Sequence, residues 1–355
     1  VLPTLSAVSI SSSNSAATWA VVDDTVTVKI AASETIASPT CEFKTDTTNA
    51  VSGAVSVSGS ATSWTCTYTA ADLDNPGAVS FTIDAADPAG NALVQVVGVT
   101  DSSAIVFDDV APTLTAVSLS SSNAAGSLAK PGDTVTATIT ASEAILAPTC
   151  AFNTATSNPV AGSVAVTGSG TDWTCTVDVA SGDTAGAVSF TIDGSSDLAG
   201  NALAQVTAVT DGSSMTFDKT APTLSAVVIS SDNGEDSLAK AGDAVTLTIT
   251  ASEGLTADPV CVFQTGGADV TGAAVVVTDT SSGAGTGWTC VYTTVAGDTA
   301  GAVSFSVTGQ DAAGNLMEVT AVTDSSEMVL DNAVPTLTAV TIASDNGVDT
   351  TLATA

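Results

Sequence analysis

The 355-residue chain contains no histidine and no arginine, and its only basic side chains are five lysines. Proteins usually grip nucleic-acid and membrane phosphates with arginine forks or lysine clusters, so neither nucleic acid nor a membrane is an expected partner of this segment. Catalysis near neutral pH usually recruits His, an activated Cys or Lys, or a tuned pair of carboxylates. Because His is absent and the lysines are few, we expect no enzyme.

Long apolar runs and aromatic side chains are also scarce. No apolar stretch approaches membrane-spanning length, and no signal peptide is visible, although both features can lie outside this sequence. Hydrophobic residues nevertheless make up 44% of the chain, and its mean hydropathy is positive, which supplies core material and argues against disorder. The net charge of −32 indicates a saline setting, bound divalent cations or both, with simple solubility as the alternative.

One phrase recurs along the chain at intervals the size of a domain. "FDDVAPTLTAV" at 107–117 returns as "FDKTAPTLSAV" at 217–227 and as "LDNAVPTLTAV" at 330–340, and the chain opens on "VLPTLSAV". The prolines of the phrase are 109, 110 and 113 residues apart. We predict three complete repeats, at 1–109, 110–219 and 220–332, and the start of a fourth repeat at 333–355.

Apolar residues alternate with polar ones inside each repeat. In "DTVTVKIAASE" the residues Val26, Val28 and Ile30 share one face, which is typical of half-buried strands. The second repeat predicts seven strands, near 113–120, 133–142, 149–154, 160–167, 172–179, 186–193 and 204–217, with a hairpin around "TDGS" as the alternative for the last segment. Short strands separated by regular turns predict an all-β fold of tandem antiparallel β-sandwich domains with about seven strands each.

Each repeat has two cysteines, 25, 25 and 29 positions apart. They occupy strand positions that face the core, so we predict one intradomain disulfide per domain: Cys41–Cys66, Cys150–Cys175 and Cys261–Cys290. A metal site is the alternative, but the spacing lacks paired C-x-x-C motifs and there is no His. Disulfides indicate an oxidising compartment, either outside the cell or in a periplasm.

The phrases "APTLTAVSLSSSN", "GDTVTATITASE", "GAVSFTIDGSSDLAGN" and "TDGSSMTFDKTAPT" together resemble the bacterial Ig-like repeats of giant secreted cell-surface adhesins. The resemblance covers the whole chain and implies an extracellular, cell-surface location. One departure matters: the Trp stands two residues before the second Cys, unlike antibody domains. The resemblance is therefore to the sandwich in general, and antibody-type loop recognition does not carry over.

Three polar elements recur in the same order in every repeat. They are the Glu of "ASE", the Asp and Asn of "D-x-A-G-N", and the linker Asp of the recurring phrase. The full set is Glu34, Asp87, Asn91, Asp108, Glu143, Asp197, Asn201, Asp218, Glu253, Asp311, Asn315 and Asp331.

We expect the three elements to meet at the junction between consecutive domains. In an antiparallel sandwich we expect the second strand to end at the pole next to the following domain, where it would place the Glu. We expect the loop after the sixth strand, with its Asp and Asn, and the end of the last strand, with the linker Asp, at the same pole. Their carboxylate and amide oxygens suit Ca²⁺, which accepts six to eight oxygens, and Mg²⁺ is the second choice. The resemblance also implies linkers stiffened by such ions, so the linker Asp would tie one domain to the next.

The alternative is turn chemistry alone, in which "D-x-A-G-N" is an Asx-type turn and the linker Asp stays in solvent. Asp84 and Asp193 are optional further ligands, because the third repeat has Thr308 at their position. Asp24, Asp133 and Asp243 are interpreted as turn residues.

The leading functional interpretation is a structural segment, the stalk or filament of a long extracellular adhesin whose partners are neighbouring repeats of the same chain. Other copies of the chain would be partners in the first alternative, a laterally polymerising surface-layer or fibre subunit with exposed edge strands. The second alternative is a glycan-binding module, which needs aromatic side chains on a solvent face. Trp19 stands alone where the other repeats have Leu128 and Leu238, and is expected to fill that position.

Overall fold

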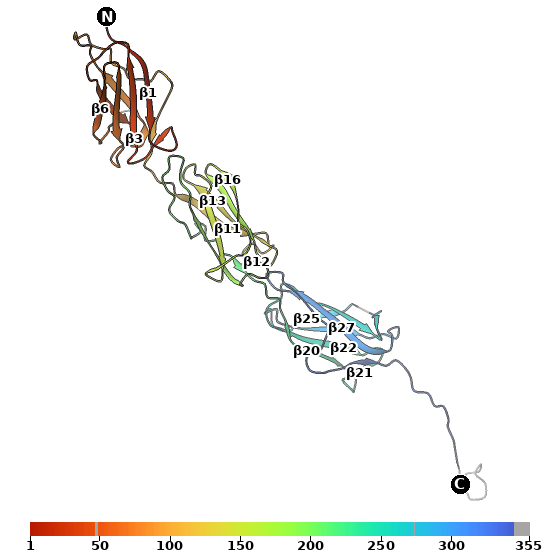
Figure 1. Cartoon of the computed structure of the whole chain (residues 1–355). Helices are drawn as coiled ribbons and strands as arrows, with labels where there is room; N and C mark the ends of the chain where they lie inside the picture. Colours follow the sequence, from red (N-terminus) through yellow and green to blue (C-terminus); the bar gives the residue numbers. More distant parts are fainter. Residues whose placement is uncertain (47–48, 273, 344–355) are drawn as a thin grey trace. The chain divides into compact units, whose positions relative to one another are not determined.

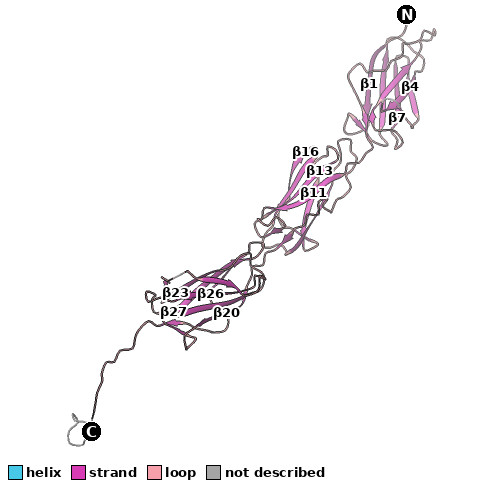
Figure 2. Cartoon of the chain, turned by 180° about the vertical axis from the view of Figure 1, so that it is seen from behind, coloured by secondary structure: helices cyan, strands magenta, loops and turns pink. Residues whose placement is uncertain are grey.

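The computed structural model describes residues 1–46, 49–272 and 274–343. The chain divides into two compact units, Val1–Asp218 and Lys219–Ala355. Every regular element of the described part is a β-strand, as Figure 2 shows. Within those residues there is no helix with the length and apolarity needed to cross a membrane.

The strands recur in the same order in each repeat. The first repeat has β1 (Leu5–Ser12), β2 (Trp19–Ala20), β3 (Thr25–Ala32), β4 (Thr40–Thr45), β5 (Asn49–Ala50), β6 (Val55–Ser60), β7 (Ser63–Thr69), β8 (Gly77–Ala78), β9 (Ser80–Asp84) and β10 (Val106–Phe107). The second has β11 (Leu114–Ser121), β12 (Leu128–Ala129), β13 (Thr134–Ala141), β14 (Thr149–Thr154), β15 (Asn158–Pro159), β16 (Ala165–Ser169), β17 (Asp172–Asp178), β18 (Gly186–Asp193) and β19 (Thr216–Phe217). The third has β20 (Leu224–Ser231), β21 (Leu238–Ala239), β22 (Ala244–Ala251), β23 (Val260–Thr265), β24 (Ala268–Asp269), β25 (Val276–Asp279), β26 (Gly287–Thr293), β27 (Gly301–Gln310), β28 (Leu316–Val319) and β29 (Val329–Leu330).

The second repeat is a sandwich of two sheets, with strand orders β11-β13-β17-β16 and β12-β19-β18-β14-β15. Figure 1 shows β11, β13 and β16 in yellow and green. Within the sheets the strands pair antiparallel, except that β12 runs parallel to β19. The arrangement is immunoglobulin-like. The strands β11, β13, β17 and β16 correspond to A, B, E and D of an immunoglobulin domain, and β14, β18 and β19 correspond to C, F and G. The first repeat has equivalent strands, with the second sheet divided into β2-β10-β8 and β5-β4-β9, and the third repeat adds β28 beside β27. The prediction of tandem all-β Ig-like sandwiches is confirmed.

Each repeat has its own hydrophobic core, in which the alternating residues of both sheets meet. In β13 the inward side chains Val135, Ala137 and Ile139 are fully buried, as the period-two pattern predicts. The three cores lie within 1–109, 110–219 and 220–332. The exact domain boundaries stay a prediction.

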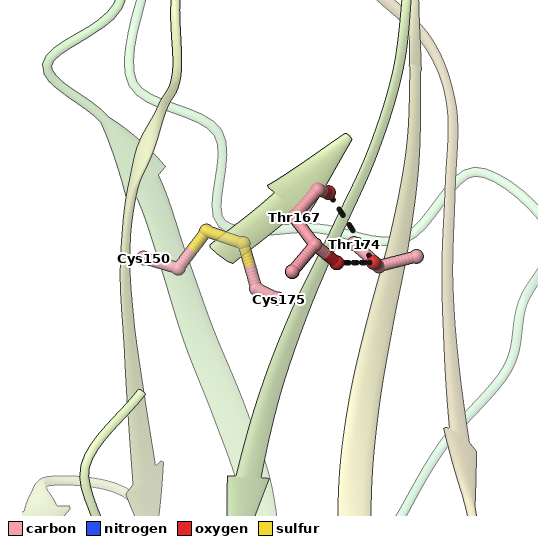
Figure 3. Close-up of a disulfide and its surroundings, with 4 residues drawn as sticks. All are labelled: Cys150, Thr167, Thr174 and Cys175. Atoms are coloured by element: carbon pink, nitrogen blue, oxygen red, sulfur yellow. Dashed lines mark hydrogen bonds between the residues drawn. A yellow bond between two sulfur atoms is a disulfide. The ribbon is translucent and has the colours of Figure 1, made fainter. Parts of the chain in front are cut away.

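All six cysteines are paired as predicted, in Cys41–Cys66, Cys150–Cys175 and Cys261–Cys290. Figure 3 shows the second of these bonds, which joins β14 of one sheet to β17 of the other across a Cα–Cα distance of 6.3 Å. Beside it, the hydroxyls of Thr167 and Thr174 lie 2.8 Å apart across β16 and β17. In antibody domains the bond joins strands B and F, whereas here it joins the equivalents of C and E.

The predicted strand at 204–217 is wrong for most of its length. The structure has one isolated bridge there, between Val206 and Ile192, and the two-residue strand β19. The strand predicted at 160–167 also moves, because β16 covers Ala165–Ser169. The apolar alternation of these segments is real, but most of their residues do not join a ladder.

The segment at 204–217 instead covers the edge of β11 with side-chain hydroxyls. Thr210 Oγ1 accepts the N–H of Val117 at 2.9 Å, and Ser213 Oγ accepts the N–H of Leu119 at 2.8 Å. The backbone N–H of Thr210 in turn donates to the Val117 carbonyl at 2.8 Å. Exposed strand edges invite pairing with other chains, and these contacts occupy the edge instead.

Candidate functional site

The "D-x-A-G-N" segment of the second repeat is a tight turn built around the carboxylate of Asp197. That carboxylate accepts the N–H groups of Gly200 at 2.6 Å and Asn201 at 2.9 Å, and the Asn201 side-chain amide at 2.8 Å. Gly200 has a φ of +110°, which a residue with a side chain rarely adopts. Asp87 with Asn91, and Asp311 with Asn315, form the same two bonds between the aspartate carboxylate and the asparagine, while the glycine N–H donates to the aspartate backbone carbonyl. The Asx-type turn expected as the alternative is therefore present.

The Glu of "ASE" follows the end of β13 and is fixed by the serine before it. Ser142 donates its N–H to the carbonyl of Thr113 at 2.8 Å, and its hydroxyl accepts the N–H of Thr113 at 3.0 Å. These two bonds hold Glu143 beside the start of its own repeat. Ser33 with Thr4, and Ser252 with Thr223, repeat the pair of contacts.

The linker aspartate Asp108 has contacts on both sides. Its N–H donates to the carbonyl of Ala20 at 2.9 Å, which continues the parallel pairing of β2 and β10. Its carbonyl accepts the side-chain amide of Asn201 at 3.0 Å, from the second repeat. One carboxylate oxygen accepts the N–H of Val110 at 3.0 Å. Asp108 thus lies between the two repeats of unit 1 and contacts both.

Asp108, Glu143 and Asp197 come together as one group, which we call the junction cluster. Each offers a carboxylate oxygen, and these oxygens all lie within 4.8 Å of one another. Asp197 is 2% exposed, and the other two side chains are half-buried. Three carboxylates at this distance repel one another unless protons or a cation compensate.

The electrostatics of the junction cluster appear most clearly at Glu143. Burial raises the pKa of this carboxyl, and the negative charges of Asp108 and Asp197 raise it further. The residues present fit a hard divalent cation, because every carboxylate donor is an oxygen and the groups converge from a linker and two loops. The side-chain amide of Asn201 donates hydrogen bonds to the carboxylate of Asp197 and to the backbone carbonyl of Asp108. A role of Asn201 as a metal ligand through its amide oxygen stays a prediction.

The expected direction of the junction was wrong. We expected the Glu and the "D-x-A-G-N" turn to meet the linker Asp that follows them, but Glu143 and Asp197 meet Asp108, which precedes them. The pairing of Leu114 with Ala141 gives the reason, because β13 runs back to the pole where β11 begins. The last strand, β19, exits at the opposite pole with Asp218.

The other repeats place the same residue types in the same local settings. Glu253 and Asp311 belong to unit 2, where Asp311 is 1% exposed, and Asp218 ends unit 1. Glu34 and Asp87 have the corresponding positions in the first repeat. Asp331 donates its N–H to the Ala239 carbonyl at 2.8 Å, as Asp108 does to Ala20.

The aspartates interpreted as turn residues have that role. The carboxylates of Asp24, Asp133 and Asp243 each accept the side-chain amide of an asparagine ten positions earlier, at 2.7 Å, and a backbone N–H three positions earlier. The two optional ligands accept glutamine amides instead, Asp84 from Gln95 and Asp193 from Gln205. Asp193 is therefore a suitable control residue outside the junction cluster.

Acid is expected to destabilise the turn at Asp243. The ammonium of Lys240, 2.7 Å away, and the amide of Asn233 lower the pKa of this carboxyl from its usual value near 3.8 to about 2. A depressed folded-state pKa gives stability above pH 3.8 that is lost as the pH falls towards 2. Urea unfolding at several pH values checks this, and Lys240→Met should flatten the dependence. An unchanged dependence in that variant would contradict the contribution of Lys240.

Trp19 has the role expected of a substitute for Leu. It pairs with Val106 in β2, as Leu128 pairs with Thr216 and Leu238 with Val329. Its side chain is half-buried and lines a cavity of about 300 Å³ together with Ile10. Trp19 is thus part of the parallel edge of the sandwich.

No protein-family model and no curated protein matches this chain. Among solved structures, it is similar to an I-band fragment of titin at 11% identity, which covers 93% of this chain and 99% of that chain with a TM-score of 0.40. A marsupial T cell receptor has 10% identity, covers 89% and 100% of the two chains, and has a TM-score of 0.33. Titin domains in complex with telethonin have 15% identity, cover 63% and 98%, and have a TM-score of 0.21. At such identities and scores, these likenesses add nothing to the sheet topology described above.

Proposed function

We propose that this chain is a structural segment of a long extracellular surface protein, the stalk or filament of a bacterial adhesin, whose repeats are tied together by calcium ions. The observation that carries the proposal is the junction cluster. Its three carboxylates come from a linker and from two loops of the following repeat, so a cation bound there restrains the linker. The calcium ion would supply positive charge, and Asp108, Glu143 and Asp197 would hold it.

Calcium fits this donor set better than magnesium. Ca²⁺ accepts six to eight oxygens in flexible geometry, whereas Mg²⁺ requires near-ideal octahedral geometry and dehydrates reluctantly. Three carboxylates on loops and a linker, completed by water or carbonyl oxygens, match the more tolerant ion. The strongly acidic chain and the disulfides agree with an extracellular setting, where calcium is plentiful.

Two observations favour a stalk over the alternatives. Hydroxyls cover the edge N–H groups of β1, β11 and β20, which removes sites for lateral strand pairing. All eight phenylalanines are buried in the cores, so they offer no platform for a sugar. The proposal therefore assigns the repeats to spacing and stiffness.

Solution scattering of the full chain tests the proposal. We expect the interatomic distance distribution derived from scattering to be narrower in calcium and broader in chelator, because the ion restrains the linkers. The scattering of Asp108→Asn in calcium should lie between that of the wild type in calcium and that of the wild type in chelator, because the variant loses one ligand charge. Asp193→Asn, which changes a carboxylate outside the cluster, should respond to calcium as the wild type does. Identical scattering in calcium and in chelator would overturn the proposal.

A further inference from the structure

A second contact crosses the same junction and involves no carboxylate of the junction cluster directly. Asn14, in the loop between β1 and β2, donates its side-chain amide to the carbonyl of Ala199 at 3.0 Å. Ala199 lies in the "D-x-A-G-N" turn of the second repeat, 185 positions away, and its residue is 1% exposed. The same amide group of Asn14 also donates to Asp24 at 2.7 Å. Asn14 therefore bonds its own repeat and the next one.

Asn14 is held in position by its own repeat before it contacts the next one. Its side-chain oxygen accepts the N–H of Ala16 at 2.8 Å, and its backbone N–H donates to the hydroxyl of Ser12 at 3.1 Å. The carboxylate of Asp24 that receives the amide also accepts the N–H of Val21 at 2.8 Å. A side chain fixed in this way loses little further rotamer freedom when it binds the neighbouring repeat.

The contact reaches Asp197 through a single peptide group. The carbonyl of Ala199 and the N–H of Gly200 belong to one planar peptide unit. That carbonyl accepts from Asn14, and that N–H donates to the carboxylate of Asp197 at 2.6 Å. Hydrogen bonds linked in series polarise one another, so the bond from Asn14 strengthens the bond to Asp197. The loop of the first repeat thus acts on a carboxylate of the junction cluster.

We propose that Asn14 is a positioning residue, which orients the turn of the following repeat and, through the Ala199–Gly200 peptide, the carboxylate of Asp197. The action on the turn stands on the hydrogen bonds alone. The consequence for a bound cation rests on the function proposed above. The first repeat would then prepare the cation site of the second repeat, to which it is joined in unit 1.

The chain offers a matched control for this role. Asn233 repeats the local bonds of Asn14, because its amide donates to Asp243 at 2.7 Å and its oxygen accepts the N–H of Glu235. Residues 316–355 do not contain another "D-x-A-G-N" motif, so a protein made of residues 1–355 gives Asn233 no counterpart of Ala199. Asn14→Ala and Asn233→Ala lose the same local turn contacts, and Asn14→Ala alone loses the contact with the next repeat.

Hydrogen–deuterium exchange of the full chain in chelator tests the action on the turn. We expect Asn14→Ala to speed exchange in 196–203 by roughly two- to ten-fold, the size of one lost hydrogen bond. Asn233→Ala should leave 196–203 unchanged. Both variants should loosen their own turns, at 12–24 and 231–243, to similar extents, which accounts for local damage. Wild-type exchange at 196–203 in Asn14→Ala would overturn the proposal.

Calcium titration of the same variants tests the consequence for the cation. Asn14→Ala should weaken calcium binding at the junction cluster by a similar factor, whereas Asn233→Ala should not. Equal calcium affinity in Asn14→Ala and in the wild type would overturn the proposal that Asn14 positions Asp197 as a calcium ligand. If wild type binds no calcium, the proposed function fails, and the chelator experiment still decides the role of Asn14 in the turn.

Discussion

Reduction of the disulfides is expected to lower the melting temperature of each sandwich by roughly 12–32 °C. A bond closing a loop of this length stabilises by about 3–4 kcal/mol in the chain-entropy model, and for a domain of this size each kcal/mol moves the melting temperature by roughly 4–8 °C. The bonds join the two sheets of their repeats across cores in which Cys66, Cys175 and Cys290 are fully buried. Calorimetry of oxidised and fully reduced protein checks the shift.

A double variant isolates one bond. Cys150→Ala with Cys175→Ala should destabilise the second repeat and leave the stability of the first and third close to wild type, because each core is separate. Exchange of buried amides in β13, β3 and β22 reports on the three repeats individually. Equal loss of protection in all three would contradict independent cores, and no loss in β13 would contradict the stabilising role of the disulfide.

Glu143→Gln is expected to have opposite effects in calcium and in chelator. In chelator the variant removes one of three carboxylates that repel one another, so the second repeat should become more stable. In calcium the wild type gains about 2.7 kcal/mol when the ion exceeds its dissociation constant a hundredfold, and the variant should lose most of this gain. Urea unfolding in both conditions checks the reversal, with Asp193→Asn as a control that should show none.

The pH dependence in chelator follows from the raised pKa of Glu143. The folded state holds this proton to a higher pH than the unfolded chain, whose glutamates titrate near 4.5. The contribution of Glu143 to stability is therefore fully present below about pH 4.5 and is lost as the pH rises through its folded-state pKa. Glu143→Gln should remove this decline. A decline of the same size in the variant would assign the effect to other groups.

Most of the sandwich could be predicted from the sequence, because period-two alternation is a local signal. The strands that became β13, β14, β17 and β18 lie within one or two residues of their predicted ranges. The cysteine pairs were also predictable, since their positions face the core on strands of opposite sheets. The segment at 204–217 shows the same alternation, but Thr210 and Ser213 bond the edge of β11 through hydroxyls, which alternation does not reveal.

The residues of the junction cluster could be predicted from the sequence, but the motifs alone did not predict which of these residues meet in space. Asp108, Glu143 and Asp197 were selected because they recur in phase. Their grouping depends on the end of the sandwich at which each strand stops. The antiparallel pairing of the first two long strands would have predicted it, because β13 ends where β11 begins. Asn14 gave no separate signal. Its recurrence as Asn123 and Asn233 goes with a local bond to the turn aspartate in each repeat, and the contact with Ala199 appears only when the chain is folded.

Counting bound calcium tests most directly whether a cation occupies the junction cluster. Isothermal titration calorimetry of the full chain should show calcium binding, and Asp108→Asn should remove one equivalent while Asp193→Asn removes none. A wild type that binds no calcium at millimolar concentration would contradict a cation at the junction cluster, as would an Asp108→Asn variant that binds as many ions as the wild type with the same affinity.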